Sequence, residues 1–270
     1  MIGCAQITPA LIATDIDGTI ARSDHRLSRY TESVLARLWR AGVPVVLITG
    51  RHEHSAVATA RALGVGSPVI SCNGAVVTDP VSGERLWVRY MADAQVKASL
   101  EFARAHDLTI ELWGLDDRYV ECLTPPTELL DEILEYEAIV GPLDQIVASM
   151  PLVKVMIGGE PSRLDEVADG LRAAVPGMER SMAQFFEAAP IGATKQEALA
   201  FVLDALGIAP EDCWGFGDGG NDKGWMSMLG TSFAPANARE SIKEIATEVI
   251  EGNNEDGPAR LIDCRVISGF

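Results

Sequence analysis

The sequence predicts an α/β protein in which a doubly wound parallel sheet carries an inserted, smaller α+β domain. In the first and last thirds of the 270-residue chain, short continuous apolar runs alternate with segments of helical periodicity, which is the pattern of a parallel sheet covered on both faces. In the middle third the order changes to a β-α-β-β-α-β rhythm, which indicates a separate unit. Small turns rich in Gly, Asp and Thr follow several predicted strands, where doubly wound sheets bind ligands.

The N-terminal third alternates strands with helices. Apolar runs predict strands at residues 10–14, 43–49 and 69–72. Ser28 is a suitable N-cap for the first helix, whose apolar residues recur at helical spacing until Gly42 ends it. A second helix is expected over residues 54–63, ended by Gly64.

The middle of the chain is expected to fold as the inserted domain. It opens with the turn signal Pro80–Gly83. Strands are expected at residues 86–90, 108–113, 119–122, 152–157 and 182–187. Helices are expected at residues 94–106, 127–136 and 163–174. We therefore place an inserted domain at residues 79–190 and a core domain at residues 1–78 and 191–270.

The doubly wound pattern returns in the last third. Helices are expected at residues 195–206, 221–229, 241–246 and 258–262. Strands are expected between them at residues 212–216, 231–234 and 248–250. These segments extend the parallel sheet of the core domain.

Composition excludes several classes of partner. The net charge of −17, from 39 acidic and 22 basic residues, disfavours nucleic acid, so any phosphate site must be locally positive. No apolar stretch reaches the ~20 residues that span a membrane, and the N-terminus does not read as a signal peptide. Five scattered cysteines without a C-x-x-C pair indicate reduced thiols in a cytoplasmic protein. No feature demands more than a monomer or a weak homodimer.

The segment Asp15-Ile16-Asp17-Gly18-Thr19 follows the first predicted strand. Two carboxylates two residues apart on an extended chain point the same way and repel unless a cation lies between them or one stays protonated. Gly18 lets the chain bend so that main-chain N–H groups face an anion. Together these features suit phosphoryl transfer. The alternative is an acidic β-turn, since Asp-Gly is a common turn pair.

A second polar turn, Thr49-Gly50-Arg51, follows the second predicted strand. A hydroxyl here can donate to a phosphoryl oxygen, and Gly50 lets the main chain come close. Thr49 is equally suited to capping a helix. For Arg51 we favour a structural ion pair.

Two further polar segments lie in the last third. Lys195 opens a predicted helix, where the helix dipole disfavours a cation; phosphate neutralisation would explain the placement, and a solvated surface lysine is the alternative. In the run Gly215–Asp222, closely spaced glycines surround Asp218, Asn221 and Asp222. These acids offer hard oxygens suited to Mg²⁺ and Asn221 can donate to an anion; the alternative is a simple acidic loop.

These motifs, in this order, resemble those of the haloacid dehalogenase superfamily of phosphatases, and more narrowly its Cof-type branch with a subfamily IIB cap. The resemblance covers nearly the whole chain. It rests on 15–19, Thr49–Arg51, 71–75, Lys195, 217–222, 234–238 and 254–257. It implies a Mg²⁺-dependent hydrolase of small phosphorylated metabolites, such as sugar phosphates or phosphorylated cofactors, with an aspartyl-phosphate intermediate and an inserted domain that selects the substrate.

The resemblance also implies a role for each matching residue. Asp15 would be the nucleophile and a Mg²⁺ ligand, and Asp17 would be the proton donor and acceptor, ligating the metal through its main-chain carbonyl. Asp218 would complete the protein ligands of the metal and Asp222 would support that site. The residues expected to contact the phosphoryl group or substrate are Thr49, Gly50, Asn73, Lys195 and Asn221.

Two other functions stay open at this point. A phosphomutase or phosphotransferase would use the same aspartyl-phosphate with a hydroxyl acceptor. A catalytically silent ligand-binding member of the family is the other, although the full set of reacting residues argues against it.

Other conspicuous side chains receive no functional role. The four histidines lack the spacing of a metal site and are expected at the surface or in turns: His25, His52, His54 and His106. Three tryptophans are expected to be buried aromatics: Trp87, Trp113 and Trp225. No Gly-x-Ser-x-Gly or P-loop motif is present, which disfavours a serine hydrolase and a P-loop NTPase.

Overall fold

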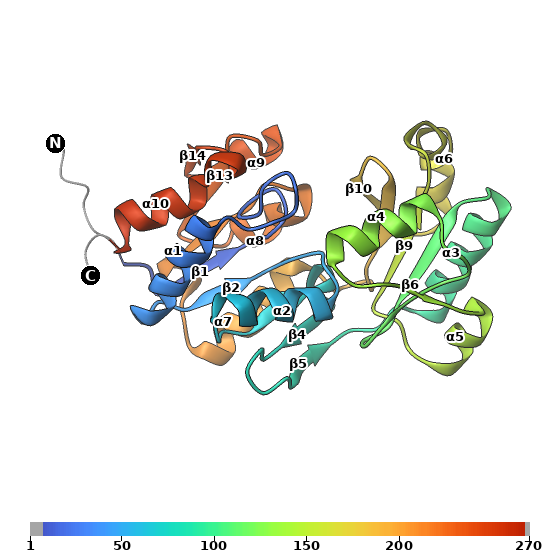
Figure 1. The fold of residues 1–270 in the computed structure, drawn as a ribbon, viewed down its shortest axis with the longest axis horizontal. Coiled ribbons are helices and arrows are strands. Elements are labelled where there is room, and N and C mark those ends of the chain that lie inside the picture. The colour runs from blue at the N-terminus through green and yellow to red at the C-terminus, as the bar shows by residue number, and fades with distance from the viewer. Residues whose placement is uncertain (1–7, 268–270) are drawn as a thin grey trace. The chain divides into compact units, whose positions relative to one another are not determined.

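The computed structural model describes residues 8–267, which divide into two compact units (Figure 1). The first contains the chain up to Gly50, Ala56–Leu86 and the chain from Thr194 onward. The second contains Arg51–Ser55 and Trp87–Ala193. The sequence places the boundary at residue 79, whereas the first unit extends to Leu86, within a strand, Arg85–Val88, whose sheet partners lie in that unit.

The first unit is built on a five-stranded sheet in which all neighbouring strands run parallel. Its order is β14 (Glu248–Ile250), β13 (Thr231–Pro235), β12 (Cys213–Phe216), β1 (Leu11–Thr14) and β2 (Val45–Leu47). A second sheet contains β3 (Val69–Ser71), β4 (Val76–Thr78) and β5 (Arg85–Val88). A parallel bridge from Ile48 to Ile70 links the two sheets. The predicted parallel α/β fold is confirmed.

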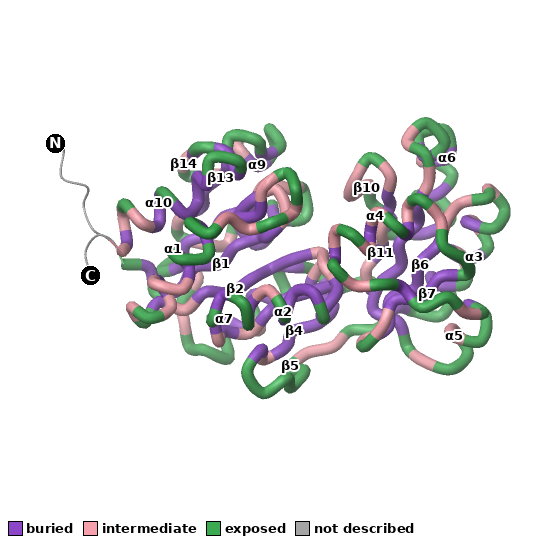
Figure 2. The backbone as a smooth tube through the Cα atoms, viewed as in Figure 1, coloured by how far each residue is buried: buried purple, intermediate pink, exposed green. Residues whose placement is uncertain are grey.

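Helices cover the large sheet. They are α1 (Arg29–Arg40), α2 (Glu53–Leu63), α7 (Lys195–Leu206), α8 (Lys223–Met226), α9 (Glu240–Lys243) and α10 (Gly257–Arg265). Ser28 caps α1 as expected, because its Oγ accepts the N–H of Thr31 at 3.0 Å. Side chains of α1, α2 and α10 share one apolar core with the strands, and Figure 2 shows β1 and β2 as buried. Helices α7 and α8 pack against each other.

Two predicted elements of the chain are wrong in detail. The helix expected over 221–229 is a 3₁₀ turn, Gly220–Asp222, followed by the short α8. The strand expected over 182–187 is a hairpin of two strands that turns after Met182. Both segments are short and mix polar with apolar residues, so periodicity alone does not fix where a helix or strand begins and ends.

The second unit has a six-stranded sheet, which is antiparallel except for its last pair. The order is β10 (Glu179–Met182), β11 (Phe185–Ala188), β9 (Lys154–Gly158), β6 (Thr109–Trp113), β7 (Arg118–Val120) and β8 (Ile139–Val140). The helices of this unit are α3 (Asp93–Ala105), α4 (Pro125–Leu134), α5 (Leu143–Ser149) and α6 (Pro161–Ala174). Strands β4 and β8 and helix α5 were not expected; all three are short.

The two faces of this sheet differ in chemistry. Ile110 and Leu112 of β6 belong to an apolar core that α3, α5 and α6 share. Glu111 and Trp113 alternate with them and therefore point to the opposite face. Glu111 there contacts Arg118 of β7, so this face carries buried charges.

The described cysteines are free thiols: Cys72, Cys122, Cys213 and Cys264. The fifth, Cys4, lies outside the described residues. Within residues 8–267, none of the helices has both the length and the apolar character needed to cross a membrane.

Candidate active site

Asp15 directly follows the central strand β1. Its main-chain N–H donates to Phe216 O of β12 at 2.9 Å, so the strand pairing continues to this residue. Its side-chain Oδ1 accepts the N–H of Ile16 at 2.8 Å. Asp15 is 7% exposed, and a buried carboxylate requires compensating partners. Within residues 8–267, its second oxygen, Oδ2, accepts no protein hydrogen bond.

Gly18 brings the turn after β1 close to Asp218. Its φ is +77°, a conformation that side chains with a Cβ rarely adopt. A Cβ at this position would lie 2.4 Å from Asp218 Oδ2. Thr19 then donates its hydroxyl to Asp218 Oδ1 at 2.9 Å. The Asp-Gly-Thr run therefore ties two distant acidic motifs together and is more than an acidic β-turn.

Lys195 is the first residue of α7, after the N-cap Thr194, whose Oγ1 accepts the N–H of Glu197. Its Nζ lies 3.1 Å from Asp15 Oδ1 and 2.7 Å from Asp222 Oδ1. The side chain is 1% exposed. The alternative of a solvated surface lysine is therefore wrong.

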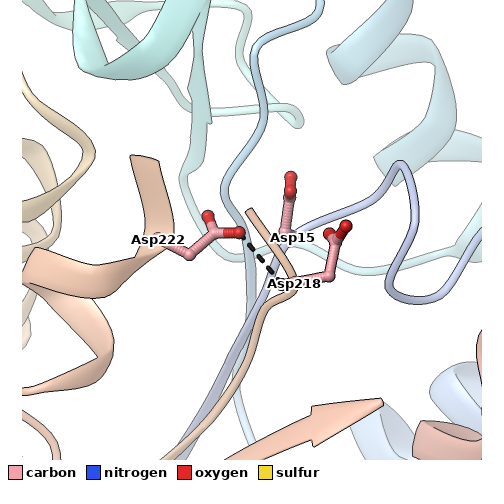
Figure 3. A group of neighbouring side chains, drawn as sticks. All are labelled: Asp15, Asp218 and Asp222. Carbon is pink, nitrogen blue, oxygen red and sulfur yellow. Dashed lines mark hydrogen bonds between the residues drawn. The ribbon is translucent and has the colours of Figure 1, made fainter. Parts of the chain in front are cut away.

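Both carboxylate oxygens of Asp222 accept hydrogen bonds from neighbouring groups of the site. Oδ1 accepts from Lys195 Nζ and from Trp225 Nε1, the latter at 3.0 Å. Oδ2 accepts the N–H groups of Asp218 and Gly219 at 3.1 and 2.9 Å. Figure 3 shows Asp222 reaching from its own segment toward Asp218. The expected buried aromatic Trp225 thus also orients an acid of the site, which its spacing three residues after Asp222 could have indicated.

The chain matches the model of a known protein family along nearly its whole length. The model of the haloacid dehalogenase-like hydrolase family matches residues 12–262. This chain belongs to the haloacid dehalogenase-like hydrolases.

Two curated relatives of this hydrolase are equally similar to it. A phosphoglycolate phosphatase of Methanopyrus kandleri is 27% identical, covering 94% of this chain and 95% of the relative. A 5-amino-6-(5-phospho-D-ribitylamino)uracil phosphatase of Bacillus subtilis is also 27% identical, covering 94% and 96%. The resemblance seen in the sequence, and the expectation of a phosphoric monoester hydrolase, are confirmed at the level of the family.

A solved structure gives the same result for the fold. The haloacid dehalogenase-like hydrolase of Bacteroides thetaiotaomicron superposes with a TM-score of 0.86 at 26% identity, covering 95% of this chain and 99% of that one. The single fold therefore extends over both units of the chain.

The three buried or partly buried carboxylates of the site in this haloacid dehalogenase-like hydrolase, Asp15, Asp218 and Asp222, repel one another. Burial, followed by the charge of Asp222, raises the pKa of Asp15 well above its ordinary value, although Lys195 opposes the rise. Burial and Asp222 likewise raise the pKa of Asp218 to about 6. Burial alone would lower the pKa of Lys195, but Asp15 and Asp222 outweigh it and raise that pKa. One ammonium thus does not neutralise the surrounding carboxylates.

This donor set fits a divalent cation. Asp15, Asp218 and Asp222 each offer a carboxylate oxygen, and these atoms lie within 4.8 Å of one another (Figure 3). Hard oxygen donors with excess negative charge are what Mg²⁺ requires. Because Asp222 already accepts four hydrogen bonds, Asp15 and Asp218 are the acids best able to turn an oxygen toward a metal. The side chain of Asp17 is not part of this group.

The remaining expected residues form a chain of contacts beside the acids. Thr49 is buried; its N–H donates to Ile70 O, and its carbonyl accepts the N–H of Asn73 at 3.1 Å. Asn73 Oδ1 accepts from Asn221 Nδ2 at 3.1 Å. A Cβ on Gly50 would lie 3.0 Å from Asn73 Oδ1, so a larger residue at this position would have to shift the Asn73 side chain. Helix α2 begins only at Glu53, so Thr49 is not its N-cap.

The histidine expectation fails at one position. His52 is fully buried within the second unit, not at the surface. Its Nε2–H can donate to Gly114 O, 3.1 Å away, while Nδ1 accepts the N–H of His54. Burial lowers the pKa of His52 to about 4, so the neutral ring satisfies both contacts. A lone histidine after a turn gives no sequence signal for such burial.

Proposed function

We propose that this protein is a Mg²⁺-dependent phosphatase that hydrolyses small phosphorylated metabolites through a phosphorylated Asp15. The observation that carries the proposal is Asp15 itself. This carboxylate is buried, lies 3.1 Å from the Lys195 ammonium and keeps Oδ2 clear of protein hydrogen bonds within the described part of the chain. Such an oxygen can act as a nucleophile on phosphorus.

The first step transfers the phosphoryl group to the enzyme. Asp15 Oδ2 forms a bond to phosphorus while the bond from phosphorus to the leaving oxygen breaks. Asp17 gives its proton to that oxygen, which departs as an alcohol. Lys195 and Asn221 donate to the phosphoryl oxygens, and the Thr49 hydroxyl does the same.

The second step releases inorganic phosphate. Asp17, now ionised, takes a proton from water, whose oxygen bonds to phosphorus as the bond to Asp15 breaks. Asp15 and Asp218, with the main-chain carbonyl of Asp17, would hold Mg²⁺. When bound, Mg²⁺ would offset the repulsion between the carboxylate and the phosphate. Asp222 keeps Lys195 and the glycine-rich turn in place.

We assign the choice of substrate to the inserted domain, which the structure places at Trp87–Ala193. We assign the enzyme itself to the cytoplasm, because its described cysteines are free thiols. The partner is a small phosphorylated metabolite rather than nucleic acid. Two relatives of equal identity carry the names of different substrates, so overall similarity does not choose between them. A substrate panel is therefore the informative experiment.

The test uses the purified chain with p-nitrophenyl phosphate and a panel of alkyl phosphates, phosphoglycolate and sugar phosphates among them. We expect inorganic phosphate release that stops in EDTA and returns with Mg²⁺. Asp218→Asn is expected to raise the Mg²⁺ concentration for half-maximal activity by about 10- to 100-fold. The exposed Asp169→Asn on α6 is the matched control. Transfer of phosphate to a sugar hydroxyl instead of water, or turnover in EDTA, would contradict the proposal.

A further inference from the structure

The side chain of His25 contacts that of Asp17, a contact that none of the sequence motifs predicts. His25 Nδ1 lies 3.0 Å from Asp17 Oδ1, and the two side chains are 31% and 32% exposed. In the tautomer that carries its hydrogen on Nδ1, the ring donates to the Asp17 carboxylate. This hydrogen bond restricts the rotation of the Asp17 carboxylate about its side-chain bonds.

The main chain presents His25 in an uncommon conformation. Its φ is +62°, a left-handed value that Asn, Asp and His adopt more readily than other side chains. The loop closes on itself, because His25 N–H donates to Arg22 O and Arg22 N–H donates to Arg26 O, both at 2.9 Å. The loop therefore aims the imidazole at Asp17 by its own main-chain bonds.

The C-terminal turn, residues 253–256, holds the base of this loop at three successive positions. Asn253 Nδ2 donates to Ala21 O at 2.9 Å. The Arg22 guanidinium pairs with both oxygens of Asp256, at 2.7 and 3.2 Å. Asn254 Oδ1 accepts the N–H of Ser23 at 3.0 Å.

Such a bidentate ion pair and main-chain contacts restrict the loop more than one surface hydrogen bond would. The segment that carries His25 is thus fixed from a part of the sequence more than 200 residues away.

We propose that His25 is a positioning residue of the phosphatase reaction, which holds Asp17 in the orientation needed for proton transfer to the leaving oxygen. The inference rests on the proposed function. The imidazole contacts Oδ1 of Asp17 and so helps to fix the plane of the carboxyl group. A general acid must lie within hydrogen-bond reach of the atom it protonates, so a loss of orientation slows that step.

The dependence on the leaving group separates positioning from a merely structural role. An alkyl phosphate needs a proton on its departing oxygen, whereas p-nitrophenolate leaves with little help. The ratio of kcat/KM values for the two kinds of ester therefore measures how much proton donation by Asp17 contributes to the rate. A loop that is simply damaged would lower both values and raise the Mg²⁺ requirement, because Asp17 is also a proposed metal ligand.

Two substitutions at position 25 distinguish the effect of the hydrogen bond from the effect of the main-chain conformation. His25→Gly keeps the left-handed φ and removes the imidazole. His25→Asn keeps both the φ and a polar group near the place of Nδ1. Asn254→Ala loosens the base of the loop without touching His25 or Asp17, and His106→Asn on the second unit is the control for loss of a histidine.

We expect His25→Gly to lower kcat/KM about 10- to 100-fold for the best alkyl phosphate of the panel and less than about 3-fold for p-nitrophenyl phosphate. His25→Asn should restore the alkyl phosphate activity to within about 3-fold of the original chain, and Asn254→Ala should produce a smaller loss of the same kind. The melting temperature and the Mg²⁺ requirement should stay unchanged in both position-25 variants.

Equal losses on the two esters, or a His25→Gly variant as active as the original chain, would overturn the inference while leaving the phosphatase proposal intact. That proposal fails separately if the original chain releases no phosphate or if Asp15→Asn retains turnover.

Discussion

Each unit of the protein buries a cluster of charges, and the two clusters differ in how they are neutralised. In the first unit, one cation, Lys195, faces three carboxylates. In the second, Arg118 pairs with Glu111 and Asp131. Lys154 pairs there with Glu187 at 2.6 Å, and its Nζ lies 4.4 Å from the centre of the Trp113 ring.

The second cluster is close to balanced within the protein. Among the residues that the structure describes, Arg118 and Lys154 pair with Glu111, Asp131 and Glu187, and burial raises the pKa of Glu111 to about 7 against the opposing charge of Arg118. A proton can therefore remove the remaining charge near neutral pH. The first cluster keeps an excess of negative charge, which is the property of a cation site. Buried charge indicates function here only where the protein leaves it uncompensated.

The largest effect is expected from Asp15→Asn, which removes one carboxylate from the cluster in the first unit. We expect turnover to fall by at least about 1,000-fold, because an amide is no nucleophile. The same variant should melt at a higher temperature than the original chain in EDTA, since the substitution removes one of the mutually repelling carboxylates. Phosphate release and thermal unfolding measure the two effects. A lower melting temperature in EDTA would show that Lys195 already balances the cluster.

Arg118→Met should lower the stability of the protein, whereas Asp15→Asn should raise it. Removing the cation takes the ion-pair partner from the buried Glu111 and from the partly exposed Asp131, and breaking a buried pair in this way costs about 3–5 kcal/mol of unfolding free energy. Urea unfolding measures the loss. Arg163→Met, which breaks an exposed pair with Glu166, is the control and should cost less than about 1 kcal/mol. Similar losses for both variants would contradict a balanced buried cluster.

A smaller effect concerns the pH dependence of stability. The raised pKa of Glu111, about 7 against 4.5, gives stability at low pH that is lost as the pH rises through 7. The lowered pKa of His52, about 4 against 6.5, gives stability above pH 6.5 that is lost as the pH falls through 4. Each contributes about 3 kcal/mol, and the two slopes oppose each other between pH 4.5 and 6.5.

Urea unfolding of Glu111→Gln and His52→Gln across this range separates the two contributions. Relative to the original chain, Glu111→Gln should gain stability as the pH rises, and His52→Gln should lose it. If both differences stayed flat with pH, the two groups would titrate as they do in the unfolded chain.

Much of the fold follows from local pattern. The alternation of apolar strands with helices predicts the parallel sheet, and Ser28 marks the start of α1 correctly, because periodicity and capping are local properties. Short elements escape this reasoning. Strand β8 and helix α5 are too brief to show a period, and the hairpin of β10 and β11 has no strong turn signal between Met182 and Phe185.

For the site, the sequence by itself determined which side chains are available: the acids of two motifs, the lysine and the glycines that let turns approach them. It did so because phosphoryl chemistry restricts residue type and spacing. Only the tertiary structure decided how these groups pair. The burial of Lys195 between Asp15 and Asp222, the contact of Trp225 with Asp222, the burial of His52 and the approach of His25 to Asp17 depend on side-chain packing. Packing brings together residues that no local pattern relates.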